Sequence, residues 1–479
     1  MSNPNPVNNA KVAIILAAGQ GTRMHSEKPK VLHTALGKAL IDHVIDTAEE
    51  AGATEIVVVV GHGKEQVIEH LGSRSHVTIA VQDIQNGTGH AASVALAALS
   101  KSDTGAVLVL SGDAPLITAT DLTKLFAAQS GKSAALLTSH LLDPSGYGRI
   151  IRAEDESVSR IVEHRDATEV ELALTEVNSG TYCFDLEELR KCLTAVDSKN
   201  SQGEIYLTDV IALMHDQGGK VVALETDSAN ILGVNDRKQL ADVIAILRQR
   251  ILSNFMLAGV TIEDPATTWI ESEVAIAPDA TLQSNVRLTG KTSIASGAVI
   301  GPDCTLADTK VFADAKVFKT TAIEAVIGNR ALVGPYTYLR PGTVLGDDAK
   351  AGGFVEMKNA TLGAGAKVPH LSYVGDAEIG EGSNIGAATI FVNYDGVEKH
   401  KTIVGKHVRI GSDTMLVAPV TIGDGAYTAA GSVITEDVPA GAIGVGRSRQ
   451  RNILDWVLRR RPGSDSAKAA VADSDKKNS

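Results

Sequence analysis

The chain has 479 residues, of which 44% are hydrophobic and 21% are charged. This length and composition predict a folded protein of two or three domains, each with its own core. The formal net charge of -12 at pH 7 argues against a nucleic-acid partner, because binding a nucleic-acid backbone needs clustered Lys and Arg. A small anionic substrate is compatible with this charge, since a local basic pocket can lie inside an acidic protein.

The three cysteines, Cys183, Cys192 and Cys304, are widely spaced and form no CxxC pair. This pattern favours neither a disulfide framework nor a zinc site, and it is typical of a reducing compartment. The N-terminal segment MSNPNPVNN is polar, and no apolar stretch reaches about 18 residues. The sequence therefore predicts a cytoplasmic protein with no membrane partner.

Short apolar runs alternate with helical patterns from Lys11 to about Met214. The runs are VAIIL at 12–16, EIVVVV at 55–60 and VLVL at 107–110, and a helical pattern covers 39–51. Continuous apolar runs that alternate with helices predict a parallel sheet wound with crossovers, and thus a Rossmann-like α/β domain over 1–235. Ligands of such sheets bind beyond the carboxyl ends of the strands, where 17–30 and 111–115 fall.

A connecting helix is predicted over 236–258, because apolar residues recur there at helical spacing along one side. These residues are Leu240, Val243, Ile244, Leu247 and Ile251. The sequence pattern changes directly after this segment, which favours a connector over another surface helix of the first domain.

From about Val260 onwards aliphatic residues recur with a period of six. They are Ile276, Leu282, Leu288, Ile294, Ile300, Leu306, Ile327, Val333, Leu339, Leu345, Val404, Ile410, Leu416 and Ile422. This period predicts a parallel β-helix over 259–450, with each aliphatic residue pointing into the prism and roughly ten coils in all. Interruptions at 351–360 and 391–401 indicate where the solenoid carries its function. The remaining 451–479 is predicted as a C-terminal helix and, after Arg461, a disordered tail.

A glycine-rich segment, LAAGQGTRM at 16–24, follows the first predicted strand. Its glycines let the backbone approach a polyphosphate while peptide N–H groups donate to it. Arg23 and Lys30 add positive charge. A glycine-rich turn alone is a weak signal, whereas its combination with KPK at 28–30 is much more specific.

These residues resemble the nucleotide-sugar pyrophosphorylase superfamily. With the hexapeptide half included, the chain to about Arg451 resembles the bifunctional N-acetylglucosamine-1-phosphate uridyltransferases and glucosamine-1-phosphate acetyltransferases. The resemblance implies acetylation of glucosamine 1-phosphate by acetyl-CoA, and then transfer of uridylyl from UTP to N-acetylglucosamine 1-phosphate with release of pyrophosphate. It also implies a left-handed β-helix, a homotrimer and a supply of precursors for peptidoglycan and the cell envelope.

Carried over residue by residue, the resemblance assigns a nucleotide-sugar site to the first domain. Its residues would be Leu16, Ala17, Ala18, Gly19, Lys30, Gln82, Gly87, Thr88, Gly148, Glu163, Asn178 and Asn235. Arg23 and Lys30 would neutralise charge during catalysis, because phosphoryl transfer depends mainly on positioning and electrostatics. Mg²⁺ prefers hard oxygen ligands and keeps several waters, so Asp113 in LSGDAPL and Asn235 in LGVND form a sufficient set of ligands together with the substrate phosphates.

The second site implied by the resemblance lies on the β-helix. His370 would be the general base, because a neutral imidazole can accept the proton of an attacking amine. Glucosamine 1-phosphate would contact Arg340, Lys358, Tyr373 and Asn384. Acetyl-CoA would contact Ala387, Asn393, Tyr394, Ser412, Ala430 and Arg447.

Two features of this half leave questions open. Where many relatives read GAGTITCNYDG, this chain has GAATIFVNYDG, and the bulk at Ala388, Phe391 and Val392 could alter coenzyme affinity. Trp456 is expected either to fasten a terminal helix or to close a neighbouring acetyl-CoA site. Two alternatives also stay open: a pyrophosphorylase with a purely regulatory β-helix, and a non-catalytic subunit of an exchange complex.

Overall fold

The computed structural model describes residues 10–99, 104–198 and 200–478. The chain divides into two compact units, Met1–Thr292 and Ser293–Ser479. The polar N-terminal segment, residues 1–9, lies outside the described residues. The boundary lies within the six-residue repeat, and the first solenoid strands belong to the first unit.

The first unit is built on a twisted sheet in the order β11-β7-β10-β6-β1-β4-β5. Its strands are β1 (Ala10–Ala17), β4 (Glu55–Val60), β5 (Val77–Val81), β6 (Gly105–Ser111), β7 (Ala134–His140), β8 (Arg149–Arg152), β9 (Val158–Val162), β10 (Glu176–Asp185) and β11 (Val221–Glu225). A separate small hairpin pairs β2 (Thr34–Ala35) with β3 (Lys38–Ala39). Its helices are α1 (Leu40–Glu50), α2 (Lys64–Leu71), α3 (Thr88–Ala98), α4 (Ala119–Gln129), α5 (Glu169–Leu172), α6 (Leu186–Leu193), α7 (Asp209–Asp216) and α8 (Arg237–Leu257).

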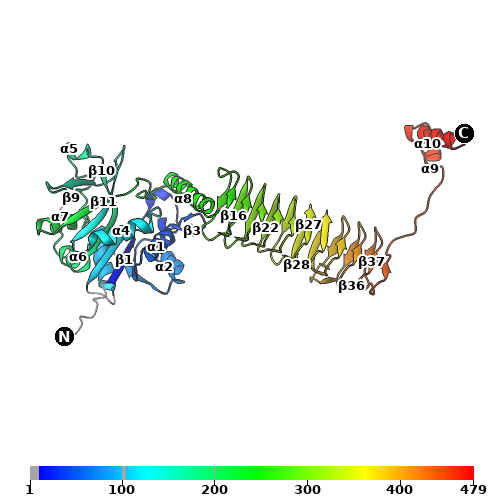
Figure 1. Cartoon of the computed structure of the whole chain (residues 1–479), viewed down its shortest axis with the longest axis horizontal. Coiled ribbons are helices and arrows are strands. Elements are labelled where there is room, and N and C mark those ends of the chain that lie inside the picture. Colours follow the sequence, from blue (N-terminus) through cyan, green and yellow to red (C-terminus); the bar gives the residue numbers. More distant parts are fainter. Residues whose placement is uncertain (1–9, 100–103, 199, 479) are drawn as a thin grey trace. The chain divides into compact units, whose positions relative to one another are not determined.

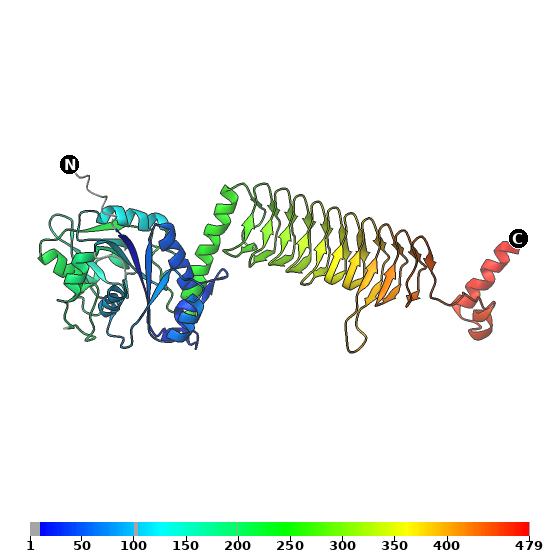
Figure 2. The same ribbon diagram turned by 90° about the horizontal axis from the view of Figure 1, so that it is seen from below.

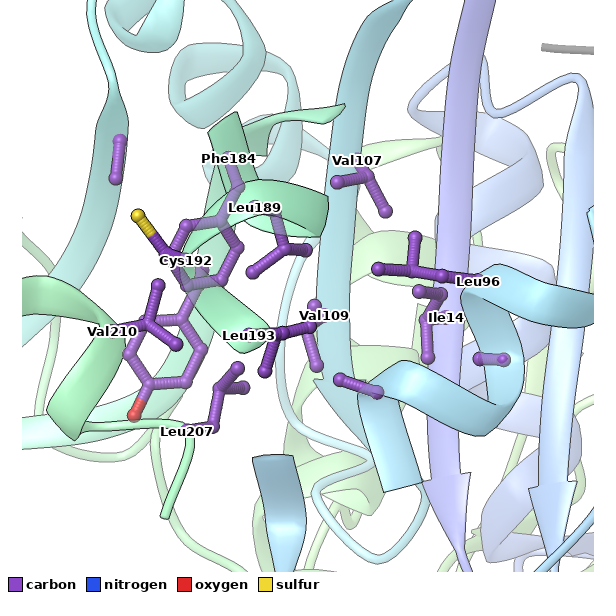
Figure 3. Packing of buried hydrophobic residues seen from close by; sticks show 14 of the residues in the cluster. Ile14, Leu96, Val107, Val109, Phe184, Leu189, Cys192, Leu193, Leu207 and Val210 are labelled. Atoms are coloured by element: carbon purple, nitrogen blue, oxygen red, sulfur yellow. The ribbon is translucent and has the colours of Figure 1, made fainter. Parts of the chain in front are cut away.

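Strand β1 lies at the centre and is buried on both faces. Val12 and Ile14 face the core formed with α3, α6 and α7, whereas Ala13 and Ile15 face the core formed with α1, α2 and α4. Figure 1 labels β1 and the helices α1, α2, α4, α6 and α7, and Figure 3 shows Ile14 with residues of the first core. Burial on both faces explains why the strand reads as an unbroken apolar run.

The expectation of a parallel sheet needs one correction. β1 is parallel to β4 and β6, but β10 runs antiparallel to both β6 and β7. β8 and β9 form an antiparallel pair beside it. The sheet is therefore mixed, and β10 brings Asn178 to the same side of the molecule as Gly148 on the β8 side, where the Asn178 N–H donates to the Gly148 carbonyl at 2.9 Å.

The predicted connecting helix is α8. Its apolar side, with Leu240 and Val243 buried, packs on Met24, Leu116 and Val234. Further along α8, Arg248 Nε donates to the Thr268 carbonyl at 2.7 Å. This contact and those of α8 with β12 (Thr261–Ile262) and β13 (Trp269–Ile270) attach the first solenoid strands to the first unit. The division between the units thus falls after Thr292.

The second unit is a stack of short parallel strands, from β17 (Ser293–Ile294) to β39 (Ile443–Gly444). The aliphatic residues that set the six-residue period are buried inside the stack from Ile294 to Ile422, which confirms the parallel β-helix. Figure 2 shows the successive coils and the loop that projects after β32 (Ile390–Val392). This loop lengthens one coil, because Ala377 pairs with Thr402.

The expectation of a disordered tail after Arg461 is wrong. Residues Asp465–Asn478 form helix α10, preceded by α9 (Trp456–Arg460). Ala, Lys and Asp dominate this segment, and the first two of these favour helices. Its low apolar content, which suggested disorder, does not prevent helix formation.

One corner of the solenoid repeats a left-handed backbone conformation in successive coils. Tyr336, Phe354, Leu371, Ala388 and Asp413 have φ of 57°, 57°, 49°, 59° and 58°. A residue with a Cβ pays roughly 1–2 kcal/mol for this conformation, and glycine does not. Phe391, in contrast, is fully buried inside the prism, so its bulk points away from the outer surface.

We therefore expect Ala388→Gly to raise the free energy of unfolding by about 1 kcal/mol, measured by chemical denaturation of the full-length protein. The control is Ala364→Gly, an exposed position whose φ is not positive, where glycine should cost about 0.5–1 kcal/mol instead. Equal effects of the two substitutions would contradict the explanation by backbone conformation.

Candidate active sites

A cavity of about 280 Å³ opens at the carboxyl ends of β1 and β6. Its lining residues are Leu16, Ala17, Ala18, Gly19, Lys30, Val31, Gln82, Gln85, Gly87, Thr88, Ala91, Ser111, Asp113 and Glu204. Nine of these residues were predicted from the sequence. The structure brings them together because parallel strands place their following loops at one edge of the sheet.

Glycines shape this cavity in two different ways. At Gly19 an added Cβ would meet nothing within 4 Å, so the missing side chain leaves space on the cavity side. At Gly87, where φ is +92°, a Cβ would lie 2.5 Å from the Ile205 carbonyl oxygen. The first glycine lets a ligand approach the backbone, and the second lets two loops of the protein meet.

Gln82 forms part of the far wall and has a fixed orientation. Its side chain is buried, and Nε2 donates to the Gly87 carbonyl at 3.2 Å and to His90 Nδ1 at 3.0 Å. Thr88 Oγ1 accepts a hydrogen bond from the Leu207 N–H at 3.1 Å. These bonds hold the loop between β5 and α3 against the segment before α7.

The two expected metal ligands, Asp113 and Asn235, both contact the ammonium group of Lys30. Lys30 Nζ forms an ion pair with Asp113 Oδ2 and lies 3.4 Å from Asn235 Oδ1. The Val234 N–H donates to the Asp113 carbonyl at 2.9 Å, which ties the two ligand loops together. A carboxylate and an amide oxygen that already hold one cation between them fit the hard-oxygen preference of a divalent metal. Within the described residues, no group of three or more His, Cys, Asp or Glu side chains forms a metal cluster.

Gly148, Glu163 and Asn178 form a second group, outside the lining of this cavity. The Asn178 amide nitrogen donates to the Tyr182 hydroxyl at 2.6 Å, and Thr208 Oγ1 donates to Glu163 Oε1 at 3.2 Å. Burial is the main cause that raises the pKa of Glu163 above its ordinary value. Arg23 is exposed and also lies outside the lining.

Sequence reasoning missed Arg250 of α8. Its Nη1 donates to the Leu116 carbonyl at 2.7 Å and its Nη2 to Asn230 Oδ1 at 2.5 Å. These two acceptors lie on the loops that carry Asp113 and Asn235. A long-range contact of this kind leaves no local pattern in the sequence.

The second candidate site is a charged cluster on the solenoid. Lys358 Nζ lies 3.7 Å from Asp376 Oδ2, and Asn393 Nδ2 donates to the same carboxylate oxygen. At Gly375 an added Cβ would lie 2.5 Å from the Tyr373 hydroxyl and 2.7 Å from Asn393 Nδ2. Glycine at this position therefore allows the tyrosine and the asparagine to approach each other.

Further cations lie at this cluster. Arg340 Nη1 donates to Glu356 Oε1 at 2.9 Å. The neighbouring Lys358 ammonium lowers the pKa of Lys399 below its usual value, with Arg340 as a smaller cause. Lys399 and Asp376 were not predicted, because Lys399 comes from the inserted loop and reaches Lys358 only in the folded solenoid. Lys399 and Asp376 also line an adjoining cavity of about 310 Å³.

His370 and Tyr373 stand on either side of one corner of the solenoid. His370 ends β29 (Lys367–His370) and is exposed, and Tyr373 begins β30 (Tyr373–Ile379). The Leu371 N–H donates to the Gly353 carbonyl at 2.9 Å and fixes the turn between them. Asn384 is not brought to the Lys358 cluster: it begins β31 (Asn384–Ile385) on another face, in register with Lys367.

Four of the residues expected to contact acetyl-CoA follow one corner through successive coils. Asp413 N–H donates to the Ala387 carbonyl at 2.7 Å, and Gly431 N–H donates to the Ser412 carbonyl at 2.9 Å. Ala430 precedes Gly431, at which a Cβ would lie 3.9 Å from Arg447 Cδ. Asn393 and Tyr394 instead belong to the inserted loop, where Tyr394 is exposed.

Trp456 begins α9 and is about half exposed, with the Arg461 guanidinium 5.6 Å from its ring centroid. The cysteines are free and buried. In the part of the chain that the structure describes, no helix combines the length and the apolar composition needed to cross a bilayer.

The α/β sheet carries a cavity suited to phosphates, and the hexapeptide solenoid carries a charged cluster. Together these two features indicate a transferase with two sites. Residues 13–158 match the family described as MobA-like NTP transferase domain, and residues 401–436 match the bacterial transferase hexapeptide family.

Similar proteins cover almost the whole chain, and each of the following is named bifunctional protein GlmU. The protein of Mycolicibacterium vanbaalenii is 53% identical over 464 residues, which cover 95% of this chain and 94% of the relative. Those of Kineococcus radiotolerans and Streptomyces avermitilis are 52% and 51% identical, and cover 96% and 97% of this chain and 95% and 97% of their own lengths. The chain belongs to the GlmU family of bifunctional proteins.

The raised pKa of Glu163 gives a prediction about stability. A carboxyl whose pKa is higher in the folded than in the unfolded state takes up protons on folding, so stability falls as pH rises through the interval between the two values. We expect Glu163→Gln to be more stable than the parent at pH 7.5 and to lose this advantage toward pH 4, measured by thermal unfolding. An advantage that stays constant over this pH range would contradict burial of the charged carboxylate as the cause.

Proposed function

We propose that this chain makes UDP-N-acetylglucosamine in two steps at two separate sites. The solenoid site transfers acetyl from acetyl-CoA to glucosamine 1-phosphate, and the α/β site transfers uridylyl from UTP to the resulting N-acetylglucosamine 1-phosphate with release of pyrophosphate. One observation carries the proposal: this chain of the GlmU family has two separate polar sites. In the first, Lys30 contacts Asp113 and Asn235. In the second, Lys358 and Asn393 both contact Asp376. Family membership favours this interpretation over a regulatory solenoid or a non-catalytic subunit.

At the α/β site the sugar phosphate oxygen attacks the α-phosphorus of UTP in line, the bond to the β-phosphate oxygen breaks, and pyrophosphate leaves. The protein supplies position and charge: the backbone around Gly19 approaches the phosphates, and Lys30 donates to them. Asp113 and Asn235 would hold a divalent ion, proposed to be Mg²⁺, which neutralises developing negative charge when bound. Arg23, which is exposed and lies outside the cavity lining, would have to turn toward the phosphates to contribute.

At the solenoid site the sugar amine attacks the thioester carbonyl of acetyl-CoA. The N–C bond forms, the C–S bond breaks, and the amine proton passes through His370 to the departing sulfur. The exposed position of His370 at the end of β29 allows its imidazole to reach a substrate, and a neutral imidazole is a suitable acceptor at physiological pH. Arg340, Lys358 and Lys399 would bind the sugar phosphate, with Tyr373 and Asn393 beside the sugar.

Two further proposals concern the oligomeric state of the protein and its location and role in the cell. An exposed row of large side chains, Tyr336, Phe354 and Leu371, follows one corner of the second unit, and the first two rings stack at 5.1 Å between centroids. This row supports the proposal of a homotrimer, because neighbouring copies could cover it. The substrates support a cytoplasmic location and a role in supplying precursors of peptidoglycan and the cell envelope.

The central test separates the two reactions. We expect Asp113→Ala to lower UTP-dependent release of pyrophosphate about 100-fold or more and to leave release of CoA from acetyl-CoA unchanged. We expect His370→Ala to lower CoA release about 100-fold or more and to leave pyrophosphate release unchanged. Product masses with both substrate pairs identify what is made. Equal loss of both activities in a folded single variant would contradict the division between the sites.

A second test concerns Lys399. We expect Lys399→Met to raise the KM for glucosamine 1-phosphate about 10-fold with little change in kcat, because one charge-assisted hydrogen bond to phosphate is lost. The matched control is Lys401→Met, on the same loop but paired with Glu378, which should leave the KM near the parent value. If the two variants behave alike, Lys399 does not contact the phosphate.

A further inference from the structure

We propose that Lys30 is an internal cation that occupies the metal-binding oxygens until the triphosphate of the nucleotide draws it away. This inference rests on the proposed function of the α/β site and concerns its regulation. In the structure the Lys30 ammonium touches Asp113 and lies 3.4 Å from Asn235 Oδ1. Both side chains of the Lys30–Asp113 pair are largely buried, with 16% and 19% of their surface exposed.

The ammonium and a divalent ion exclude each other from this position. Both need the lone pairs of the same carboxylate and amide oxygens, and two cations within a few ångströms repel strongly where water is partly excluded. A divalent ion that binds alone must therefore displace Lys30 from its carboxylate partner. We expect this displacement to weaken metal binding in the absence of nucleotide.

The structure also provides a second place for the ammonium. The stem of Lys30 is held near its base, because Gly21 lies so close that a Cβ there would be 2.8 Å from Lys30 Cβ. The outer part of the side chain has several rotatable bonds and lines the same cavity as Ala18 and Gly19. Phosphates bound at that backbone would give the ammonium new anionic partners and would free Asp113 and Asn235 for the metal.

Nucleotide and metal binding are then linked through one side chain. By thermodynamic reciprocity, a nucleotide that strengthens metal binding has its own binding strengthened by the metal to the same extent. The carboxylate of Asp113 also keeps a positive partner at every stage, so it is never buried without compensation. The metal consequently binds more tightly together with the nucleotide than alone.

The test measures Mn²⁺ binding, not turnover, by the electron paramagnetic resonance signal of free Mn²⁺ in titrations of the full-length protein without nucleotide. We expect Lys30→Met and Lys30→Gln to bind Mn²⁺ about 10-fold more tightly than the parent, within the usual range of coupling between sites. The control Lys38→Met removes a lysine that pairs with Asp46 at 2.8 Å outside the cavity, and it should leave Mn²⁺ affinity unchanged. Unchanged or weaker Mn²⁺ binding in both folded Lys30 variants would overturn the proposal.

Two additional titrations separate this inference from the proposed function. The first titration adds UTP, and a mixture of Mn²⁺ and UTP without protein serves as the blank. UTP should strengthen Mn²⁺ binding to the parent more than to Lys30→Met. An equal gain in both would overturn the link through Lys30. Asp113→Asn should abolish Mn²⁺ binding both in the parent and in Lys30→Met. If Mn²⁺ still binds, the metal site itself is misassigned and both proposals fail. If Asp113→Asn loses Mn²⁺ binding but Lys30→Met shows no gain in affinity, only the role of Lys30 is rejected.

Discussion

Parallel strand pairing is the constraint on which both units of this protein depend. In the α/β unit it forces each connection back over a face of the sheet, so that β1, β4 and β6 all end at one edge. In the solenoid it places equivalent residues of successive coils directly above one another. In both cases residues far apart in the chain become neighbours.

The two candidate sites share an electrostatic arrangement. Each holds cations that we propose to bind substrate against carboxylates of the same chain: Lys30 with Asp113, Arg340 with Glu356, and Lys358 with Asp376. These pairs allow basic side chains to be positioned in a protein whose net charge is strongly negative. An anionic ligand must therefore compete with these carboxylates for the basic side chains, or arrive with another cation that takes the place of the basic side chain beside the carboxylate. The proposed exchange of Lys30 for a metal ion is one instance of this arrangement.

Helix α8 supports the loops that carry Asp113 and Asn235 and also contacts the first solenoid strands. Arg250 reaches the loops of both expected metal ligands, while Arg248 reaches the first solenoid segment. The apolar residues of the same helix pack on Leu116 and Val234, which flank those ligands. A helix that the sequence marks as a connector therefore also supports the site.

The sequence by itself determined the elements whose period or composition is set by burial. The unbroken apolar run of β1, the six-residue repeat and the helix before Val260 all follow from which faces must leave water. It also predicted most of the first cavity, because residues directly after buried strands gather at one sheet edge, and the family resemblance named Asp113 and Asn235. Only the tertiary structure decided the antiparallel direction of β10, the helix α10, and the meeting of Lys399 and Asp376 with Lys358. It likewise decided that Asn384 lies apart from that cluster and that Lys30 contacts both of the expected metal ligands. These features depend on strand direction, loop path and side-chain reach, which are fixed by contacts between distant segments and leave no period in the chain.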